Sequence, residues 1–153
     1  MELDKDQIKE VQQNREPYLM LDYVTNLVPG NLCDSYKDLN ENEWFFKVHW
    51  PNDPNMPCML QIEALVQTAA ISILSLPNNK GKVMYLTTAN NVKFKKKVTQ
   101  KKRFFIKTKI ISYKRGIANC AGTGIVDNQE ACKAEFNLIL PSEIEKYNIN
   151  KEI

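Results

Sequence analysis

A long apolar stretch extends over residues 59–76 and contains neither glycine nor proline. In a helix, its apolar side chains would point to almost every side: Ile62, Leu65, Val66, Ala69, Ala70, Ile73 and Leu74. A helix that is apolar nearly all round is normally buried inside a domain. Pro57, just before it, stands at a place typical of the first helical turn. The pattern therefore predicts one long, buried central helix.

The segment that leads into this helix, residues 42–57, is rich in aromatic residues and is interrupted by Pro51, Pro54 and Pro57. Proline fixes φ and lacks an N–H, so it is excluded from helix interiors and central strands. The pattern predicts a rigid loop.

Strand-like patterns stand on both sides of the predicted helix. Residues 18–28 predict a first strand that ends at Pro29-Gly30, and residues 32–39 predict a second strand. After a turn at residues 77–81, further strands are predicted at 82–88, 92–98, 103–113, 117–126 and 130–140. One buried helix with successive antiparallel strands favours an α+β fold in which the sheet wraps around the helix.

The two ends of the chain are polar. Residues 1–16 carry only a weak helical stripe at Ile8 and Val11, which predicts a short helix or an arm, and residues 141–153 are predicted to be a peripheral tail. A chain of 153 residues is long enough for one domain with a sizeable core. The interpretation is a single domain over residues 1–153.

Composition narrows the class of protein. A hydrophobic content of 43% and a charged content of 25% are typical of a globular domain. No apolar run is long enough for a membrane span, and the acidic start Met1-Glu2-Leu3-Asp4 is unlike a secretion signal. The prediction is a cytoplasmic protein.

The four cysteines have no C-x-x-C spacing, and the chain has one histidine, so no zinc site is predicted. Cys33, Cys120 and Cys132 are interpreted as reduced packing residues. Cys58 stands beside the central helix, whose N-terminus could lower a thiol pKa, but no basic partner for a nucleophile is visible.

Three residues around the central helix carry candidate chemistry. Glu63 is a carboxyl on a helix predicted to be buried, and Gln67 shares its helix face one turn later. His49 stands on the loop before the helix. A buried carboxyl and an imidazole can serve as an acid and a base near neutral pH. The alternative for His49 is a packed or surface residue beside Trp50.

The order of these residues resembles a known family. The segments are Asn42-Glu43-x-Phe45-Phe46-x-x-His49-x-Pro51 and Pro54-x-Met56-Pro57-x-x-Leu60-x-x-Glu63-Ala64-Leu65-x-Gln67. The likeness continues in Arg15-x-Pro17-Tyr18-Leu19-x-Leu21-Asp22, in Asn91-x-Lys93-Phe94-x-x-x-Val98, in Arg115-Gly116 and in Val126-Asp127. Together they resemble the hotdog-fold 3-hydroxyacyl-[acyl carrier protein] dehydratases.

This resemblance implies that a 3-hydroxyacyl group, held as a thioester on the phosphopantetheine arm of an acyl carrier protein, is dehydrated to the trans-2-enoyl thioester, with neither metal nor redox cofactor. It implies that His49 takes the proton at C2 and that Glu63 protonates the departing hydroxyl. The backbone N–H of Cys58 would polarise the thioester carbonyl, and Gln67 would orient Glu63 or a water. In this family each site takes His49 from one chain and Glu63 from the other, so a homodimer or a larger assembly of dimers is expected.

The chain departs from the family pattern where glycine is usual, at Val48, Asn52 and Cys58, and where a Pro-Gly-Asp turn is usual, at residues 99–101. Each lost glycine adds a side chain where substrate approaches closely. Val48 would narrow the substrate channel or shift His49. The departures indicate either a dehydratase specialised for an unusual acyl group, in a specialised acyl or polyketide pathway, or a relative that has lost or changed its reaction, and the first interpretation is favoured.

Basic residues are concentrated in one part of the chain. Between Ala64 and Val126 there is no Asp or Glu, and 13 of the 21 basic residues lie there. An acidic acyl carrier protein would fit a docking patch made of Lys93, Lys95, Lys97, Lys101, Lys102 and Arg103. A solvated sheet face is the alternative, and nucleic acid is disfavoured because only three basic residues are arginine and no binding motif is present.

Two other functions stay open. A hotdog thioesterase would share fold and carrier, although the presence of both His49 and Glu63 favours the dehydratase. A non-catalytic subunit would bind the carrier without turnover. Tyr85 and Phe94 are interpreted as core residues, with a tunnel lining as the alternative.

Overall fold

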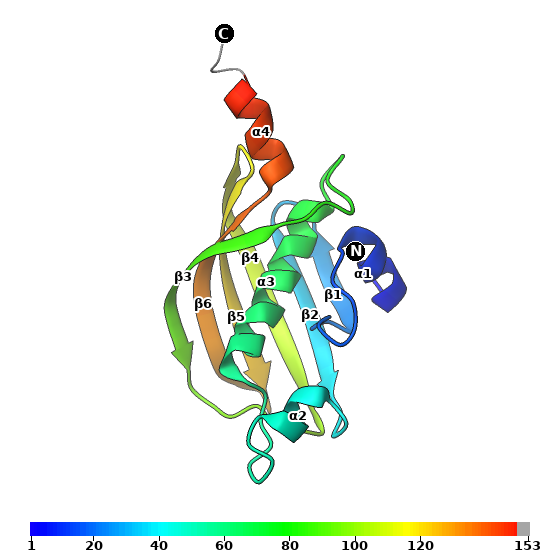
Figure 1. Cartoon of the computed structure of the whole chain (residues 1–153), viewed down its shortest axis with the longest axis vertical. Helices are drawn as coiled ribbons and strands as arrows, with labels where there is room; N and C mark the ends of the chain where they lie inside the picture. Colours follow the sequence, from blue (N-terminus) through cyan, green and yellow to red (C-terminus); the bar gives the residue numbers. More distant parts are fainter. Residues whose placement is uncertain (150–153) are drawn as a thin grey trace.

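The computed structural model describes residues 1–149, and residues 150–153 lie outside the described part. The helix α3 (Cys58–Leu74) crosses the inner face of a curved antiparallel sheet (Figure 1). The strand order is β1-β2-β4-β5-β6-β3. The strands are β1 (Tyr23–Val28), β2 (Leu32–Leu39), β3 (Tyr85–Phe94), β4 (Lys102–Lys114), β5 (Ile117–Val126) and β6 (Gln129–Ile139). The α+β fold with a sheet around one helix is confirmed.

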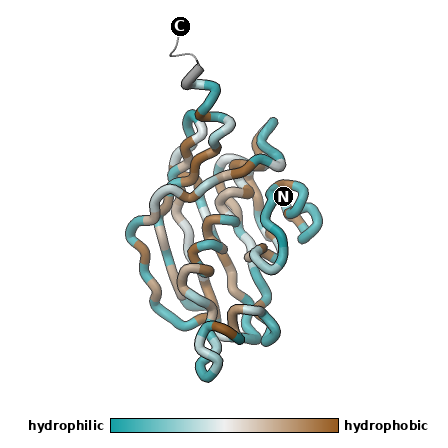
Figure 2. Tube along the Cα trace, viewed as in Figure 1, coloured by the Kyte–Doolittle hydropathy of each residue, from teal (hydrophilic) through white to brown (hydrophobic). Residues whose placement is uncertain are grey.

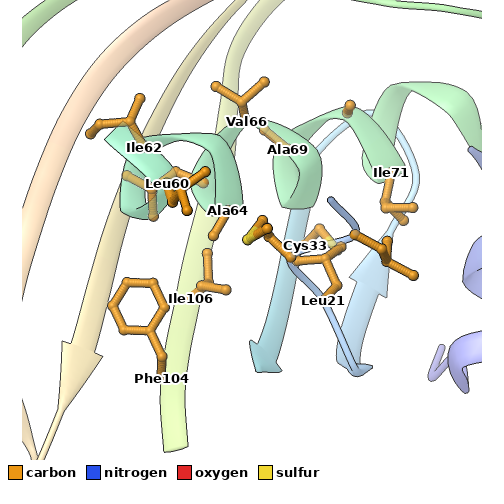
Figure 3. Packing of buried hydrophobic residues seen from close by; sticks show 14 of the residues in the cluster. Leu21, Cys33, Leu60, Ile62, Ala64, Val66, Ala69, Ile71, Phe104 and Ile106 are labelled. Carbon is orange, nitrogen blue, oxygen red and sulfur yellow. The ribbon is translucent and has the colours of Figure 1, made fainter. Parts of the chain in front are cut away.

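The helix α3 is buried as its apolar pattern predicted. Only Cys58, Met59 and Glu63 of its residues escape burial. Pro57 is the residue before the helix rather than part of its first turn. The core lies between α3 and the strands behind it, where Ala64 approaches Ile106 (Figure 3). Hydrophobic residues gather on α3 and the strands, and hydrophilic ones on α1 and the loops (Figure 2).

Packing between α3 and the sheet depends on small residues in β5. A Cβ at Gly124 would overlap the ring of Phe104 and the sulfur of Cys132, whereas a Cβ at Gly122 would lie 3.2 Å from the Leu65 Cβ. Cys33, Cys120 and Cys132 are buried and free, as predicted, and burial raises the pKa of the Cys120 and Cys132 thiols to about 12.

We therefore expect Gly124→Ala to lower the free energy of unfolding by about 1–3 kcal/mol, because it overpacks a filled core. Gly122→Ala is the matched control and should cost less, because its nearest neighbours need to move by only a few tenths of an ångström. Denaturant unfolding of both variants checks the order, and equal stabilities would contradict the packing described here.

The first predicted strand begins five residues late, at Tyr23 rather than at Tyr18. The N–H groups of Tyr18 and Leu19 both donate to Arg15 O in a turn, and Met20 N donates to a side chain of α3. These backbone groups are therefore satisfied outside the sheet. Strand β2 covers the predicted residues.

The two strands predicted at 82–88 and 92–98 are wrong as separate elements, because β3 is one strand that pairs with β6. Its register shifts between Asn90 and Lys93, and Asn91 adopts φ 51°. The Asn91 side chain donates to Glu135 Oε2 at 2.8 Å. The polar residues that the pattern assigned to a break between two strands therefore form a β-bulge within one strand.

Three helices lie around this framework. The predicted rigid loop 42–57 contains α2 (Trp44–Val48), because Phe45 and Phe46 bury their rings together from a single helical turn. The N-terminal arm contains α1 (Lys5–Val11), capped by Asp4. The predicted tail begins with α4 (Pro141–Ile149), which extends away from the sheet (Figure 1). The rest of that tail lies outside the described residues.

Candidate active site

His49 follows the last residue of α2 and faces the loop that leads into α3. Its Nδ1 lies 3.1 Å from the backbone oxygen of Asn55. A carbonyl oxygen only accepts, so Nδ1 carries the proton and Nε2 is left as the basic nitrogen. The ring stacks on Trp50, with centroids 4.3 Å apart. The loop thus fixes both the tautomer and the plane of the imidazole.

The His49 cavity, about 520 Å³ in volume, opens beside the start of α3. Cys58 lines it together with Pro57, and the Cys58 N–H stands at the first position of the helix, where no helical carbonyl precedes it to accept a hydrogen bond. The N–H groups of Leu60 and Gln61 instead donate to Pro57 O. This helix end presents a donor and a partial positive charge to the cavity.

Glu63 lies one and a half turns into α3 and is half-buried. Burial raises the pKa of its carboxyl above the ordinary value, and the hydrogen bond from Gln67 lowers it only in part. Gln67 Nε2 donates to Glu63 Oε1 at 2.8 Å and to Tyr18 O at 2.9 Å, while its Oε1 accepts from Met20 N at 2.8 Å. Gln67 is therefore fixed, and it orients the carboxyl.

Within one chain, His49 and Glu63 line different cavities. The Glu63 cavity is about 370 Å³ in volume and extends along α3. Its lining includes Gln67 and Tyr85 but not His49, and the His49 cavity does not include Glu63. A single copy of this chain therefore does not place the base and the acid on one substrate.

Val48 lines neither cavity within one chain, and 70% of its side chain is exposed. The interpretation of Tyr85 and Phe94 as core residues is wrong, because both are exposed on β3. Tyr85 lines the Glu63 cavity and Phe94 lines the His49 cavity. Both rings belong to an edge strand, where packing inside one chain is incomplete.

Most basic residues of the predicted docking patch are paired with carboxylates, which the sequence does not indicate. Strand β3 ends at Phe94, so Lys95 and Lys97 are not on a strand face as expected. Five of the six predicted patch residues have acidic partners: Lys95 with Glu130, Lys97 with Asp53, Lys101 with Glu41, Lys102 with Asp127 and Arg103 with Asp38. Lys93 alone of the six has no carboxylate within 4.0 Å in residues 1–149.

Two glutamines at the cavities were missed by the sequence analysis. Gln61 is 2% exposed and lines the His49 cavity, and its Oε1 has no hydrogen-bond partner among the described residues. Gln12 is also 2% exposed and lines the Glu63 cavity, and its Nε2 is likewise unpaired within that part of the chain. The only sequence signal for Gln61 is its place between the apolar residues Leu60 and Ile62, and Gln12, which is followed by two polar residues, has none.

The antiparallel sheet around one helix defines a hotdog fold, and solved structures agree. The dehydratase heterocomplex ApeI:P from Xenorhabdus doucetiae matches with a TM-score of 0.76 at 13% identity, over 92% of this chain and 95% of that chain. A hypothetical thioesterase protein with coenzyme A from Streptococcus pneumoniae TIGR4 matches with a TM-score of 0.58 at 11% identity, over 76% of this chain and 83% of that chain. These identities bear on the fold alone.

Sequence comparison identifies the family within this fold. The FabA-like domain matches residues 13–135. The 3-hydroxyacyl-[acyl-carrier-protein] dehydratase FabZ of Oceanobacillus iheyensis is 35% identical over 138 residues, which are 90% of this chain and 99% of that protein. FabZ of Clostridium botulinum Eklund 17B is 39% identical over 133 residues, 86% of this chain and 94% of that protein. The chain therefore belongs to the FabA-like domain family.

Proposed function

We propose that this protein dehydrates 3-hydroxyacyl thioesters carried on acyl carrier protein to 2-enoyl thioesters in fatty-acid synthesis. Relatives named 3-hydroxyacyl-[acyl-carrier-protein] dehydratase FabZ align with this chain over nearly their whole length. The observation that carries the proposal within the molecule is the His49 tautomer, because Nδ1 donates to Asn55 O and leaves Nε2 as a base. The reaction removes water without net oxidation, so the proposed chemistry needs no redox cofactor or metal.

The proposed mechanism divides the work between an acid and a base. His49 Nε2 takes the proton from C2 while the Cys58 N–H stabilises the charge that develops on the thioester oxygen. The C3–O bond then breaks, and the Glu63 carboxyl gives its proton to the leaving hydroxyl, which departs as water. Burial favours the protonated form of Glu63 that this step requires. The step leaves His49 protonated and Glu63 ionised, and a proton that passes from His49 to Glu63 through water restores both groups for the next turnover.

We propose that a complete site is built from two chains, because one chain separates His49 from Glu63. Strand β3 is exposed along its whole length, and within residues 1–149 no strand pairs with its outer side. Apolar surface on this strand is exposed at Tyr85, Leu86, Val92 and Phe94. Pairing of two β3 strands would cover this surface and bring a second α3 towards the first.

The experiment that tests the activity follows enoyl thioester absorbance and free thiol release in the same reaction, with a 3-hydroxyacyl group on acyl carrier protein. A dehydratase forms the enoyl product without releasing thiol. Thiol release alone would favour the thioesterase, and carrier binding without either signal would favour a non-catalytic subunit.

The carrier is proposed to dock beside the His49 cavity, where Lys93 has no carboxylate within 4.0 Å among residues 1–149. We expect Lys93→Glu to lower kcat/KM about threefold to tenfold at low salt with the carrier-bound substrate, and less at high salt. Lys109→Glu is the matched control, because Lys109 is an exposed lysine on β4 that does not line the His49 cavity. Equal effects of the two variants would argue against docking at Lys93.

Among the described residues, no helix is long and apolar enough to cross a membrane. A cytoplasmic location remains the prediction from the sequence.

A further inference from the structure

Lys37 carries a positive charge on the inner face of the sheet. It alternates along β2 with the same buried side as Cys33, Ser35 and Leu39, and its side chain is 6% exposed. Its cross-strand partner on β4 is the fully buried Phe104. Burying an ammonium group is costly unless a carboxylate pairs with it. The position of Lys37 therefore requires an acidic partner.

Glu43 supplies this carboxylate from the residue before α2. Its Oε1 lies 3.2 Å from Lys37 Nζ, and its side chain is 16% exposed. Each of the other ion pairs among residues 1–149 includes a side chain that is more exposed than either of these. Glu43 stands at the N-cap of α2, yet its side chain caps no N–H of that helix. The carboxylate is therefore directed to β2 rather than to its own helix.

The helix that begins after Glu43 ends at His49. The backbone N–H of His49 donates to Phe45 O at 2.9 Å and closes α2. The six positions from Glu43 to His49 correspond to about 9 Å along a helix. Helix α2 lies at the same end of the molecule as the start of α3 (Figure 1). A tilt of α2 at Glu43 therefore moves the His49 ring at the other end.

The ion pair adds direction to a helix that apolar packing already holds. The rings of Phe45 and Phe46 are buried and supply the apolar contacts of α2. A buried ion pair contributes little net stability, because the desolvation of two charges offsets their attraction. It does restrict geometry, since the ammonium and the carboxylate must stay in contact. The pair thus fixes one end of α2 to β2.

We propose that Lys37 and Glu43 are positioning residues for the base, and that their ion pair orients α2 so that His49 Nδ1 meets Asn55 O and Nε2 faces the substrate. This inference rests on the proposed dehydratase function. Neither Lys37 nor Glu43 lines the His49 cavity or the Glu63 cavity, so the pair acts through α2 and not on the substrate. A catalytic group misplaced by about 1 Å can cost roughly a hundredfold in rate.

The kinetic test uses Lys37→Met, Glu43→Met and the double variant. Each single change leaves a buried charge unpaired and should lower the thermal midpoint, whereas the double variant removes both charges and should recover most of it. The double variant should still lose about tenfold to a hundredfold in kcat, with KM within about twofold of the wild type. Two controls should keep the wild-type kcat: Lys47→Met removes an exposed charge from α2, and Glu10→Met with Lys80→Met removes an exposed ion pair outside both cavities.

The spectroscopic test uses His49 as the only histidine of the chain. In protein without a histidine tag, labelled with ¹⁵N-histidine, the two ring nitrogens of the neutral imidazole give separate NMR signals. The wild type should show the proton on Nδ1 alone, as the contact with Asn55 O requires. The double variant should show both tautomers, because the displaced ring no longer makes this contact. This measurement needs no turnover.

The outcomes separate the inference from the proposed function. A double variant with the wild-type kcat would overturn the inference and leave the dehydratase in place, because the pair would then only stabilise the fold. A loss of kcat with an unchanged imidazole spectrum would also overturn it, since the base would not have moved. If the wild type dehydrates no substrate, the proposed function fails, and the spectra alone decide: mixed tautomers in the double variant support the positioning of His49, and an unchanged spectrum overturns it.

Discussion

Replacing His49 with alanine is expected to lower kcat/KM for dehydration by about 10²- to 10⁴-fold, the usual contribution of a positioned general base. The imidazole has one nitrogen committed to Asn55 O, so only Nε2 is available for the C2 proton. Glu63→Gln should cause a loss of the same order, because an amide cannot give a proton to the hydroxyl. The measurement is the initial rate of enoyl thioester formation.

The control for this first prediction is Glu10→Gln, which removes an exposed carboxylate that pairs with Lys80 outside both cavities. Its rate should match the wild type. A circular dichroism spectrum and a thermal midpoint for each variant exclude unfolding as the cause. Full activity of His49→Ala or Glu63→Gln would remove the proposed acid and base from the mechanism.

The second large effect concerns how the two groups are combined. We expect a dimer with one His49→Ala chain and one Glu63→Gln chain to recover about half of the wild-type activity per dimer. If each site takes His49 from one chain and Glu63 from the other, one of two sites carries both changes and the other carries none. The two homodimeric variants should stay nearly inactive.

Different affinity tags on the two chains allow the mixed dimer to be purified after coexpression. A mixed dimer as inactive as its parents would contradict the shared site, because a site inside one chain is damaged in both chains. A protein that sedimented as a monomer while fully active would contradict it as well. The separate cavities of His49 and Glu63 make the mixed dimer the decisive sample.

The fold was largely predictable because its strongest patterns are local. The buried helix and strands β2 and β5 follow from apolar periodicity and turns within their own segments. Strand β3 was divided in two because its bulge is held by Glu135, which is distant in sequence. Helix α2 was missed because its two buried rings make one short turn between proline-rich and polar neighbours.

In the site, contacts within one helix were predictable from the sequence, whereas contacts between distant segments were not. Gln67 contacts Glu63 as their spacing on one helix face predicted. The acidic partners of the lysine patch were not predictable, because Lys97 meets Asp53 and Arg103 meets Asp38 only through tertiary pairing. Gln12 was missed for the same reason, since its burial depends on the packing of α1 against α3.

The position of β3 at the edge of the sheet has a consequence for handling the protein. An edge strand with exposed apolar side chains is a template for adding another strand, which leads to aggregation when the natural neighbour is absent. If two copies protect each other there, dilution would expose this template, and the dissociated chain would precipitate rather than persist. The yield of folded protein would then depend on concentration during purification as much as on temperature.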